Sequence, residues 1–194
     1  MRHLENLQVA GAVGDIPIAD LHQEMPLSSP GLKEVQVQDL HCTLLHAVDL
    51  GLDNIEQATV DAVIEDVTRY VQTLALFTLT FDRPAVGNAA FEISGWPGDT
   101  FTQIVATLTQ VMETRCGPFT AAPSRCPRIS LAYTSTGAQD INAADLKAAL
   151  SAVEGPLSGT IRADRLHLVE QRHDGAQIAW NRIAEIALTG EVPA

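Results

Sequence analysis

Two short stretches, DLHCTLLHA (Asp39–Ala47) and CPRISLAY (Cys126–Tyr133), hold the polar residues around which a fold can be predicted. Each stretch is rich in apolar residues, which predicts a β-strand in a covered sheet. Because residues i and i+2 of a strand share a face, each strand would present two polar side chains to one side and apolar side chains to the other. The four polar residues are His41, Thr43, Arg128 and Ser130.

The rest of the chain mixes helical and strand patterns. Apolar residues recur at three- and four-residue spacing from Val60 to Leu74 and from Phe101 to Met112, which predicts two helices. Asp53, Asp99 and Asn142 are the expected helix caps, and Gly117 the expected end of the second helix. The other expected elements are a strand at Leu7–Val13, a helical turn at Ile18–Met25, a loop at Pro26–Gly31, strands at Leu40–Leu50, Leu76–Asp82 and Ala89–Gly95 with a turn at Arg83–Asn88, a helix at Ala143–Val153, and strands at Ile161–Gln171 and Ile178–Leu188 joined by a turn at Arg172–Gln177.

The order of these elements does not show the alternation of strand and helix that is typical of a parallel sheet. We therefore predict the α+β class, with antiparallel sheets that carry helices on one face. A strand followed by a helix occurs in both halves, which indicates two related lobes. At 194 residues the length favours one domain.

Composition restricts the substrates and the location of the protein. The formal net charge is −12, with 12 basic against 24 acidic residues, which disfavours a long nucleic acid as partner. No apolar run approaches the ~18 residues that a transmembrane helix needs, and the N-terminus lacks the pattern of a signal peptide. We expect a cytoplasmic protein without membrane contact. The three cysteines, Cys42, Cys116 and Cys126, match neither a zinc site nor a disulfide framework and are expected to be reduced and structural.

The four polar strand residues could hold a phosphate. Two hydroxyls and a guanidinium donate hydrogen bonds to phosphate oxygens, and an imidazole can move a proton. No set of His, Asp, Glu or Cys has the spacing of metal ligands, and no glycine-rich phosphate loop is present. We therefore expect no metal and no cofactor.

The sequence resembles the 2H phosphoesterases, and within them the bacterial 2′-5′ RNA ligase-like group. The family carries two His-x-Thr/Ser motifs on strands of two related lobes, and His41-Cys42-Thr43 matches the first. The second motif is similar to PRISLAYTS (Pro127–Ser135) at nearly every position except its histidine, and Arg165–Leu188, with Trp180, resembles the closing pair of strands. The resemblance covers about residues 36–190 and leaves residues 1–35 unmatched. It implies a bilobal fold with two antiparallel sheets and outer helices around a central cleft.

The resemblance implies catalytic roles for some of these residues. In the family, one histidine acts as general base and the other as general acid on a cyclic or 2′-5′ phosphodiester, while the hydroxyls hold the phosphate. His41, Thr43 and Ser130 match these positions. Arg128 does not match, and a guanidinium neither gives nor takes a proton at neutral pH.

Three interpretations of Arg128 follow. In the first, the protein is a divergent phosphoesterase that acts on a small phosphodiester or cyclic nucleotide, with His41 as acid/base and Arg128, Thr43 and Ser130 binding the phosphate. In the second, the cleft acts on or binds a different small anionic metabolite. In the third, the protein binds a nucleotide without catalysis. All three predict a small anionic ligand such as a nucleotide.

Other residues near the motifs receive separate predictions. Arg125 precedes the second motif and His167 lies in a late strand, and both are candidates for substrate binding. His46 lies five residues after His41, hence on the opposite face of a regular strand, which indicates a packing role. Tyr133 shares a face with the apolar residues of its strand and is expected in the core.

Overall fold

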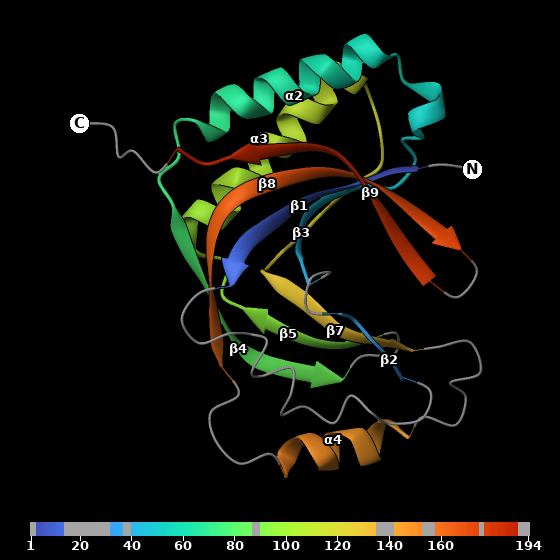
Figure 1. The fold of residues 1–194 in the computed structure, drawn as a ribbon, viewed down its shortest axis with the longest axis vertical. Helices are drawn as coiled ribbons and strands as arrows, with labels where there is room; N and C mark the ends of the chain where they lie inside the picture. Colours follow the sequence, from blue (N-terminus) through green and yellow to red (C-terminus); the bar gives the residue numbers. More distant parts are fainter. Residues whose placement is uncertain are drawn as a thin grey trace.

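In the computed structural model, the residues that can be described are 3–13, 32–36, 40–86, 90–134, 142–152, 158–174 and 177–189. They form three α-helices, a short 3-10 helix and nine β-strands (Figure 1). The strands are β1 (His3–Val13), β2 (Leu32–Glu34), β3 (Cys42–Ala47), β4 (Phe77–Val86), β5 (Ala90–Gly95), β6 (Ala121–Pro123), β7 (Arg128–Thr134), β8 (Gly159–Asp174) and β9 (Gln177–Ala187). The helices are α2 (Gln57–Val71), α3 (Gly98–Cys116) and α4 (Ala143–Ser151), and the 3-10 helix is Leu52–Asn54.

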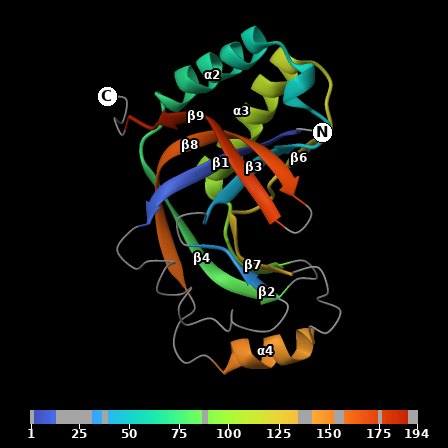
Figure 2. The ribbon, with the colours of Figure 1, turned by 45° about the vertical axis from the view of Figure 1, so that its right-hand side comes forward.

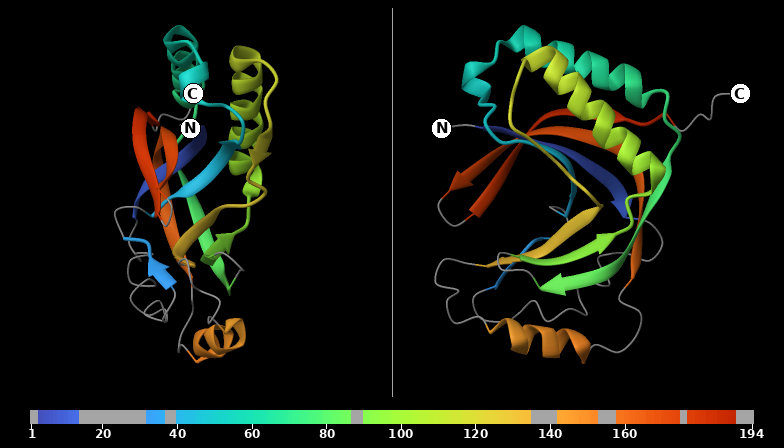
Figure 3. Two further views of the ribbon diagram at one scale, coloured as in Figure 1. Left: turned by 90° about the vertical axis from the view of Figure 1, so that its right-hand side faces the viewer. Right: turned by 180° about the vertical axis from the view of Figure 1, so that it is seen from behind.

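The strands form one antiparallel sheet in the order β2-β7-β5-β4-β8-β1-β3-β6, with β9 also paired to β8. The predicted α+β class and antiparallel pairing are therefore confirmed. The prediction of two separate sheets is not, because β8 is long enough to join both halves. Its first part, Gly159–Ala163, pairs with β4, and its later part, Arg165–Asp174, pairs with β9. Figure 3 shows β8 curving along one side of the molecule between the two groups of strands.

Helices cover the outer faces of this sheet. Figure 2 shows α2 and α3 side by side over the half that contains β1, β3, β8 and β9, while α4 lies at the other end of the molecule, beyond β4. The helices α2 and α3 form as their apolar spacing predicts, because their buried faces contact the sheet. Phe81, Phe91 and Phe101 are among the largest fully buried side chains of the resulting core. No helix in the described ranges combines the length and apolarity that crossing a bilayer requires.

The helix ends agree only in part with the sequence predictions. Asn142 caps α4 as predicted, since its side chain accepts a hydrogen bond of 3.0 Å from the amide of Ala144. Gly117 ends α3 with a φ of 75°, a conformation that glycine adopts at little cost. Asp53 was the wrong cap for α2, because it lies in the 3-10 turn and the helix begins after Glu56. Asp99 lies inside the first turn of α3, whose N-cap is Pro97.

Two strands differ from prediction in ways that affect the architecture. β4 continues to Val86 through most of the predicted turn, and β1 lies within the sheet between β3 and β8. Part of the unmatched segment 1–35 therefore belongs to the same sheet as the matched region. The predicted helical turn at residues 18–25, the loop at 26–31 and the centre of the turn at 172–177 lie outside the described residues.

Gly95 marks a close contact between β4 and β5. A Cβ atom built on Gly95 would overlap the carbonyl oxygen of Thr80 on β4. The position is buried and backbone surrounds it, so a larger residue would displace one strand from the other. Glycine here keeps β5 close to β4, and β5 in turn pairs with the second motif strand, β7.

Candidate functional site

The two motif strands meet at the central residues of their motifs. Cys42 of β3 pairs with Ile129 of β7 in an antiparallel ladder, and both side chains are buried. The residues on either side of each therefore face the opposite way, away from the core. His41 and Thr43 are half-buried, as is Ser130, while Arg128 is exposed. The antiparallel direction brings His41 toward Ser130 and Thr43 toward Arg128.

A cavity of about 640 Å³ lies over this pairing. It brings together five of the six residues predicted for the site, namely His41, Thr43, Arg125, Arg128 and Ser130. The other lining residues are His46, Ala90, Glu92, Ala122, Pro123, Ser124, Cys126, Tyr133, Gln171 and Trp180. A volume of this size falls in the range of small-molecule sites, roughly 300–1,000 Å³.

His46 lines the cavity, which corrects the prediction that it faces away from His41. In the pairing of β1 with β3, Leu7 is opposite Leu45 but the next residue, Gln8, is opposite Thr43. The extra residue on β3 is a bulge, and a bulge reverses the alternation of faces beyond it. Residues three positions apart, Thr43 and His46, consequently share the face toward the cavity.

The same irregularity follows the second motif and corrects the prediction for Tyr133. Phe91 of β5 is opposite Ala132, but Glu92 is opposite Ser130, so β7 also contains one extra residue. Tyr133 therefore returns to the face of Ser130 and lines the cavity. Burial raises the pKa of Tyr133, and a hydrogen bond with Ser130 opposes the shift. Both motifs thus extend by one further residue, as His-x-Thr-x-x-His and Arg-x-Ser-x-x-Tyr.

Arg128 is paired with a carboxylate that sequence reasoning did not single out. Its Nε lies 3.5 Å from Oε1 of Glu92, and Glu92 sits opposite Ser130 on the neighbouring strand β5. Burial raises the pKa of Glu92 above its ordinary value, and the charge of Arg128 opposes this only in part. The cavity therefore contains a permanent cation and a carboxyl group that is unusually easy to protonate.

The other walls of the cavity come from β9 and from the segment before β7. The imidazole of His41 packs edge-on against the indole of Trp180, with 4.7 Å between ring centroids. On the other side, the Ser124 hydroxyl donates a hydrogen bond of 2.6 Å to the carbonyl of Thr43. This bond holds the segment that carries Arg125 against β3, which places that guanidinium at the cavity. Arg125 lines the cavity, and its role in binding stays a prediction.

The thiols differ in their surroundings. Cys42 is buried, and burial raises its pKa to about 12, so it is not a nucleophile at neutral pH. Cys126 is half-buried and lines the cavity. All three cysteines are free, as expected.

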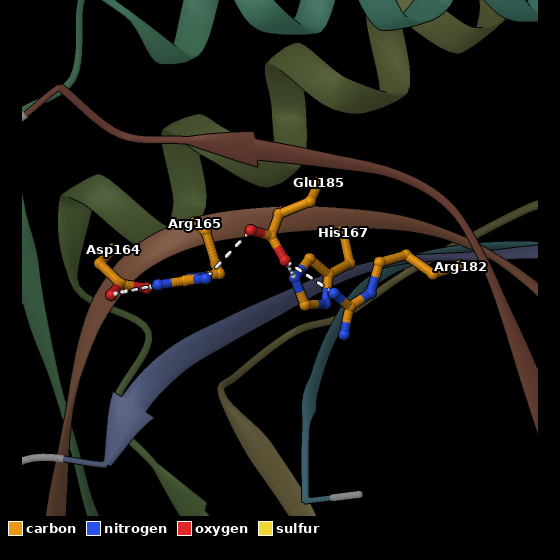
Figure 4. A network of polar contacts seen from close by, with 5 residues as sticks. All are labelled: Asp164, Arg165, His167, Arg182 and Glu185. Carbon is orange, nitrogen blue, oxygen red and sulfur yellow. Dashed lines mark hydrogen bonds and ion pairs between the residues drawn. The ribbon is translucent and has the colours of Figure 1, made fainter. Parts of the chain in front are cut away.

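His167 lies outside the cavity, so the prediction that it contacts substrate there is not supported. Gln8 of β1 is opposite Thr43 on one side and opposite His167 on the other. His167 therefore lies on the same sheet face as Thr43, but two strand spacings, roughly 10 Å, away from it. Its Nε2 lies 3.0 Å from Oε2 of Glu185 on β9, beside Arg182 (Figure 4). Burial and the nearby charge of Arg182 lower the pKa of His167, which favours its neutral form.

Figure 4 shows that this network continues along β8. Glu185 also accepts a hydrogen bond of 3.0 Å from Arg165, which in turn contacts Asp164. The described residues include no group of three or more His, Cys, Asp or Glu that could hold a metal ion. The expectation of metal-free chemistry stays a prediction.

Comparison with known proteins yields matches in structure alone. No model of a protein family and no curated protein sequence matches the chain. The structure of TT0787 from Thermus thermophilus is similar with a TM-score of 0.64 at 16% identity, over 98% of this chain and 100% of that one. LigT of E. coli in complex with 3′-AMP is similar with a TM-score of 0.61 at 15% identity, over 97% and 98% of the two chains. A structure described as a phosphoesterase is similar with a TM-score of 0.60 at 17% identity, over 95% and 99%.

The chain therefore shares its fold with LigT and with the structure described as a phosphoesterase, the fold that the resemblance to the 2H phosphoesterases implied. The similar region spans almost the whole chain, beyond residues 36–190. LigT has also been crystallised with ATP, with NADP+ and with phosphate. At these identities the likeness concerns the fold, and the roles of single residues depend on the geometry described above.

Proposed function

We propose that the protein is a divergent 2H phosphoesterase that hydrolyses a small phosphodiester or a cyclic nucleotide. The observation that carries this proposal is the direct pairing of Cys42 with Ile129, which gathers the imidazole, both hydroxyls and the guanidinium of the two motifs at one cavity. The structural likeness to LigT, which binds 3′-AMP, ATP and NADP+, supports a nucleotide as the ligand. The net charge of −12 favours a small anion over a polymer.

In the proposed site, Thr43 and Ser130 donate hydrogen bonds to the phosphate oxygens. Arg128 supplies positive charge that stabilises the negative charge on the phosphate oxygens in the transition state, as arginines do in phosphoryl transfer. His41 accepts a proton from the attacking water, and its contact with Trp180 fixes the orientation of the ring. The hydrolysis needs a second proton transfer, to the leaving oxygen, which Arg128 cannot make.

A second candidate function follows from Arg128 itself. Because Arg128 occupies the position of the second histidine, the cavity could serve a carboxylate or phosphate on a metabolite that is not a phosphodiester. In that case ligands would bind in an Arg128-dependent manner without hydrolysis of any phosphodiester. The third alternative, nucleotide binding without catalysis, predicts that nucleotides alone bind in an Arg128-dependent manner and are not hydrolysed.

The test is a hydrolysis panel of 2′,3′-cyclic nucleotides and 2′-5′-linked dinucleotides, followed by chromatography of the products. The wild-type protein is expected to open at least one substrate to a phosphomonoester or to cleave it. His41→Ala, purified in the same way, is expected to hydrolyse the substrate about 10²–10⁴ times more slowly. Because the same contaminants would copurify with this variant, it also serves as the control for contaminating nucleases. Hydrolysis that persists in His41→Ala, or binding of 3′-AMP without any turnover on the panel, would contradict the phosphoesterase proposal.

A further inference from the structure

Glu92 lies on the far side of Ser130 from His41. Ser130 pairs with Glu92 across β7 and β5, and the pairing of Cys42 with Ile129 puts His41 next to Ser130 on the other side. His41, which directly precedes β3, Ser130 on β7 and Glu92 on β5 thus form a row, and all three line the cavity. Two strand spacings, roughly 10 Å between backbones, leave room for a phosphate between the outer two side chains.

In an in-line displacement at phosphorus the attacking and leaving oxygens lie on opposite sides. When the leaving group is a ribose oxygen, one proton-transfer group is needed for the attacking water and another, on the opposite side, for the leaving oxygen. We propose that Glu92 is the second proton-transfer group of this site and takes the role left open by Arg128. The inference rests on the proposed phosphodiester hydrolysis. It gives a carboxylic acid on β5 the role that the family's second motif gives to a histidine on β7.

The surroundings of Glu92 favour its protonated form when a ligand is bound. On β7 its neighbours are Arg128 and Tyr133, and its pairing partner on β4 is the uncharged Ala85. The titratable groups of the β3 side that line the same cavity are His41 and His46. Burial already raises the pKa of Glu92 against the opposing charge of Arg128. A bound phosphate adds negative charge beside the carboxylate and draws Arg128 to its own oxygens, and both effects raise the pKa of Glu92 further.

The proton transfers then balance. Neutral His41 accepts a proton from water as the water oxygen bonds to phosphorus, and the bond from phosphorus to the leaving ribose oxygen breaks. The carboxylic acid of Glu92 gives its proton to that oxygen. The products are a phosphomonoester with a free hydroxyl, an imidazolium and a carboxylate, and exchange with solvent returns the proton from His41 to Glu92.

The geometry of the ion pair argues against a purely structural role for Glu92. At 3.5 Å, the contact between Glu92 and Arg128 is longer than the ~2.7–2.9 Å of a charge-assisted hydrogen bond. The Arg128 side chain is 60% exposed, so Glu92 does not hold it rigidly. Glu92, by contrast, is only 23% exposed and is fixed in the middle of β5. The carboxyl group of Glu92 therefore has a defined position in the cavity, but it does not restrain the guanidinium of Arg128.

Two substrates that differ in leaving group test the proposal. The ribose oxygen of 2′,3′-cyclic AMP needs a proton to leave, whereas bis(p-nitrophenyl) phosphate releases a stable phenolate without one. We expect Glu92→Gln to reduce kcat about 10²–10⁴-fold on 2′,3′-cyclic AMP and less than about tenfold on the aryl ester. The decline of wild-type activity with rising pH, caused by ionisation of Glu92, should be absent in Glu92→Gln. Glu92→Asp should retain that decline, and Glu113→Gln on α3, outside the cavity, should match the wild type.

Equal losses on both substrates would overturn the proposal, because they would mean that Glu92 positions Arg128. An unchanged rate on cyclic AMP in Glu92→Gln would overturn it as well. Both results leave the phosphoesterase function intact, since the wild type is active in each. If the wild type turned over neither substrate, the proposed function would be refuted, and this inference with it. Binding of 3′-AMP by each variant verifies that the cavity is folded.

Discussion

Replacing Arg128 with glutamine should weaken the binding of a nucleoside monophosphate by a defined amount. A hydrogen bond to a charged group contributes about 1.5–3 kcal/mol. Arg128 is 60% exposed and already shares its charge with Glu92 at 3.5 Å, so the lower end of that range applies. Because ~1.4 kcal/mol corresponds to a factor of ten, we expect the Kd of Arg128→Gln for 3′-AMP to rise about tenfold.

Isothermal titration calorimetry with 3′-AMP measures this change, first at low and then at high salt. The difference between wild type and Arg128→Gln should shrink at ~1 M salt, where the screening length falls to about 3 Å. Arg69→Gln is the matched control, because Arg69 is 66% exposed and ion-paired with Glu65 but lies on α2, outside the cavity. A Kd for Arg128→Gln equal to that of the wild type would refute the assignment of Arg128 to phosphate binding, and so would an equal loss in Arg69→Gln.

Three further predictions concern stability and accessibility. Gly95→Ala should lower the free energy of unfolding by about 1–3 kcal/mol in chemical denaturation, because the new Cβ overlaps the backbone of β4; a neutral effect would contradict that close contact. A thiol reagent at pH 8 should modify Cys126 but not Cys42 in the folded protein, and 3′-AMP should slow the reaction; modification of Cys42 at the same rate would show that its burial is wrong. Because the pKa of Glu92 is raised in the folded state, ionisation costs stability as pH rises above the ordinary value of about 4.3, so the Tm of Glu92→Gln should gain on the wild type between pH 4 and pH 7; a constant difference would contradict the raised pKa.

Strand parity together with the family resemblance predicted the four central residues that line the cavity. The alternation of polar and apolar residues in HCT and RIS is local, and the pairing of Cys42 with Ile129 converts it directly into a shared polar face. The prediction failed a few residues further along each strand, at His46 and Tyr133. Each bulge is visible only as a mismatch with a partner strand, β1 or β5, so no pattern within β3 or β7 indicated it.

Glu92 and His167 show the same dependence on partner strands. Glu92 belongs to no motif in the sequence, and its position at the cavity arises from the register of β5 against β7. His167 does share a sheet face with Thr43, but β1 separates the two strands and Glu185 engages the imidazole. The position of β1 could not be inferred either, because a single sequence does not show which strands a segment will join.

A crystal structure of the protein with 3′-AMP would test the central claim most directly, that both motif strands bind one phosphate. We predict phosphate oxygens within ~3.2 Å of the hydroxyls of Thr43 and Ser130 and of the guanidinium of Arg128, with the imidazole of His41 on one side and the carboxyl of Glu92 on the other. A phosphate bound elsewhere on the protein, or one that contacts a single motif strand, would contradict this account of the site.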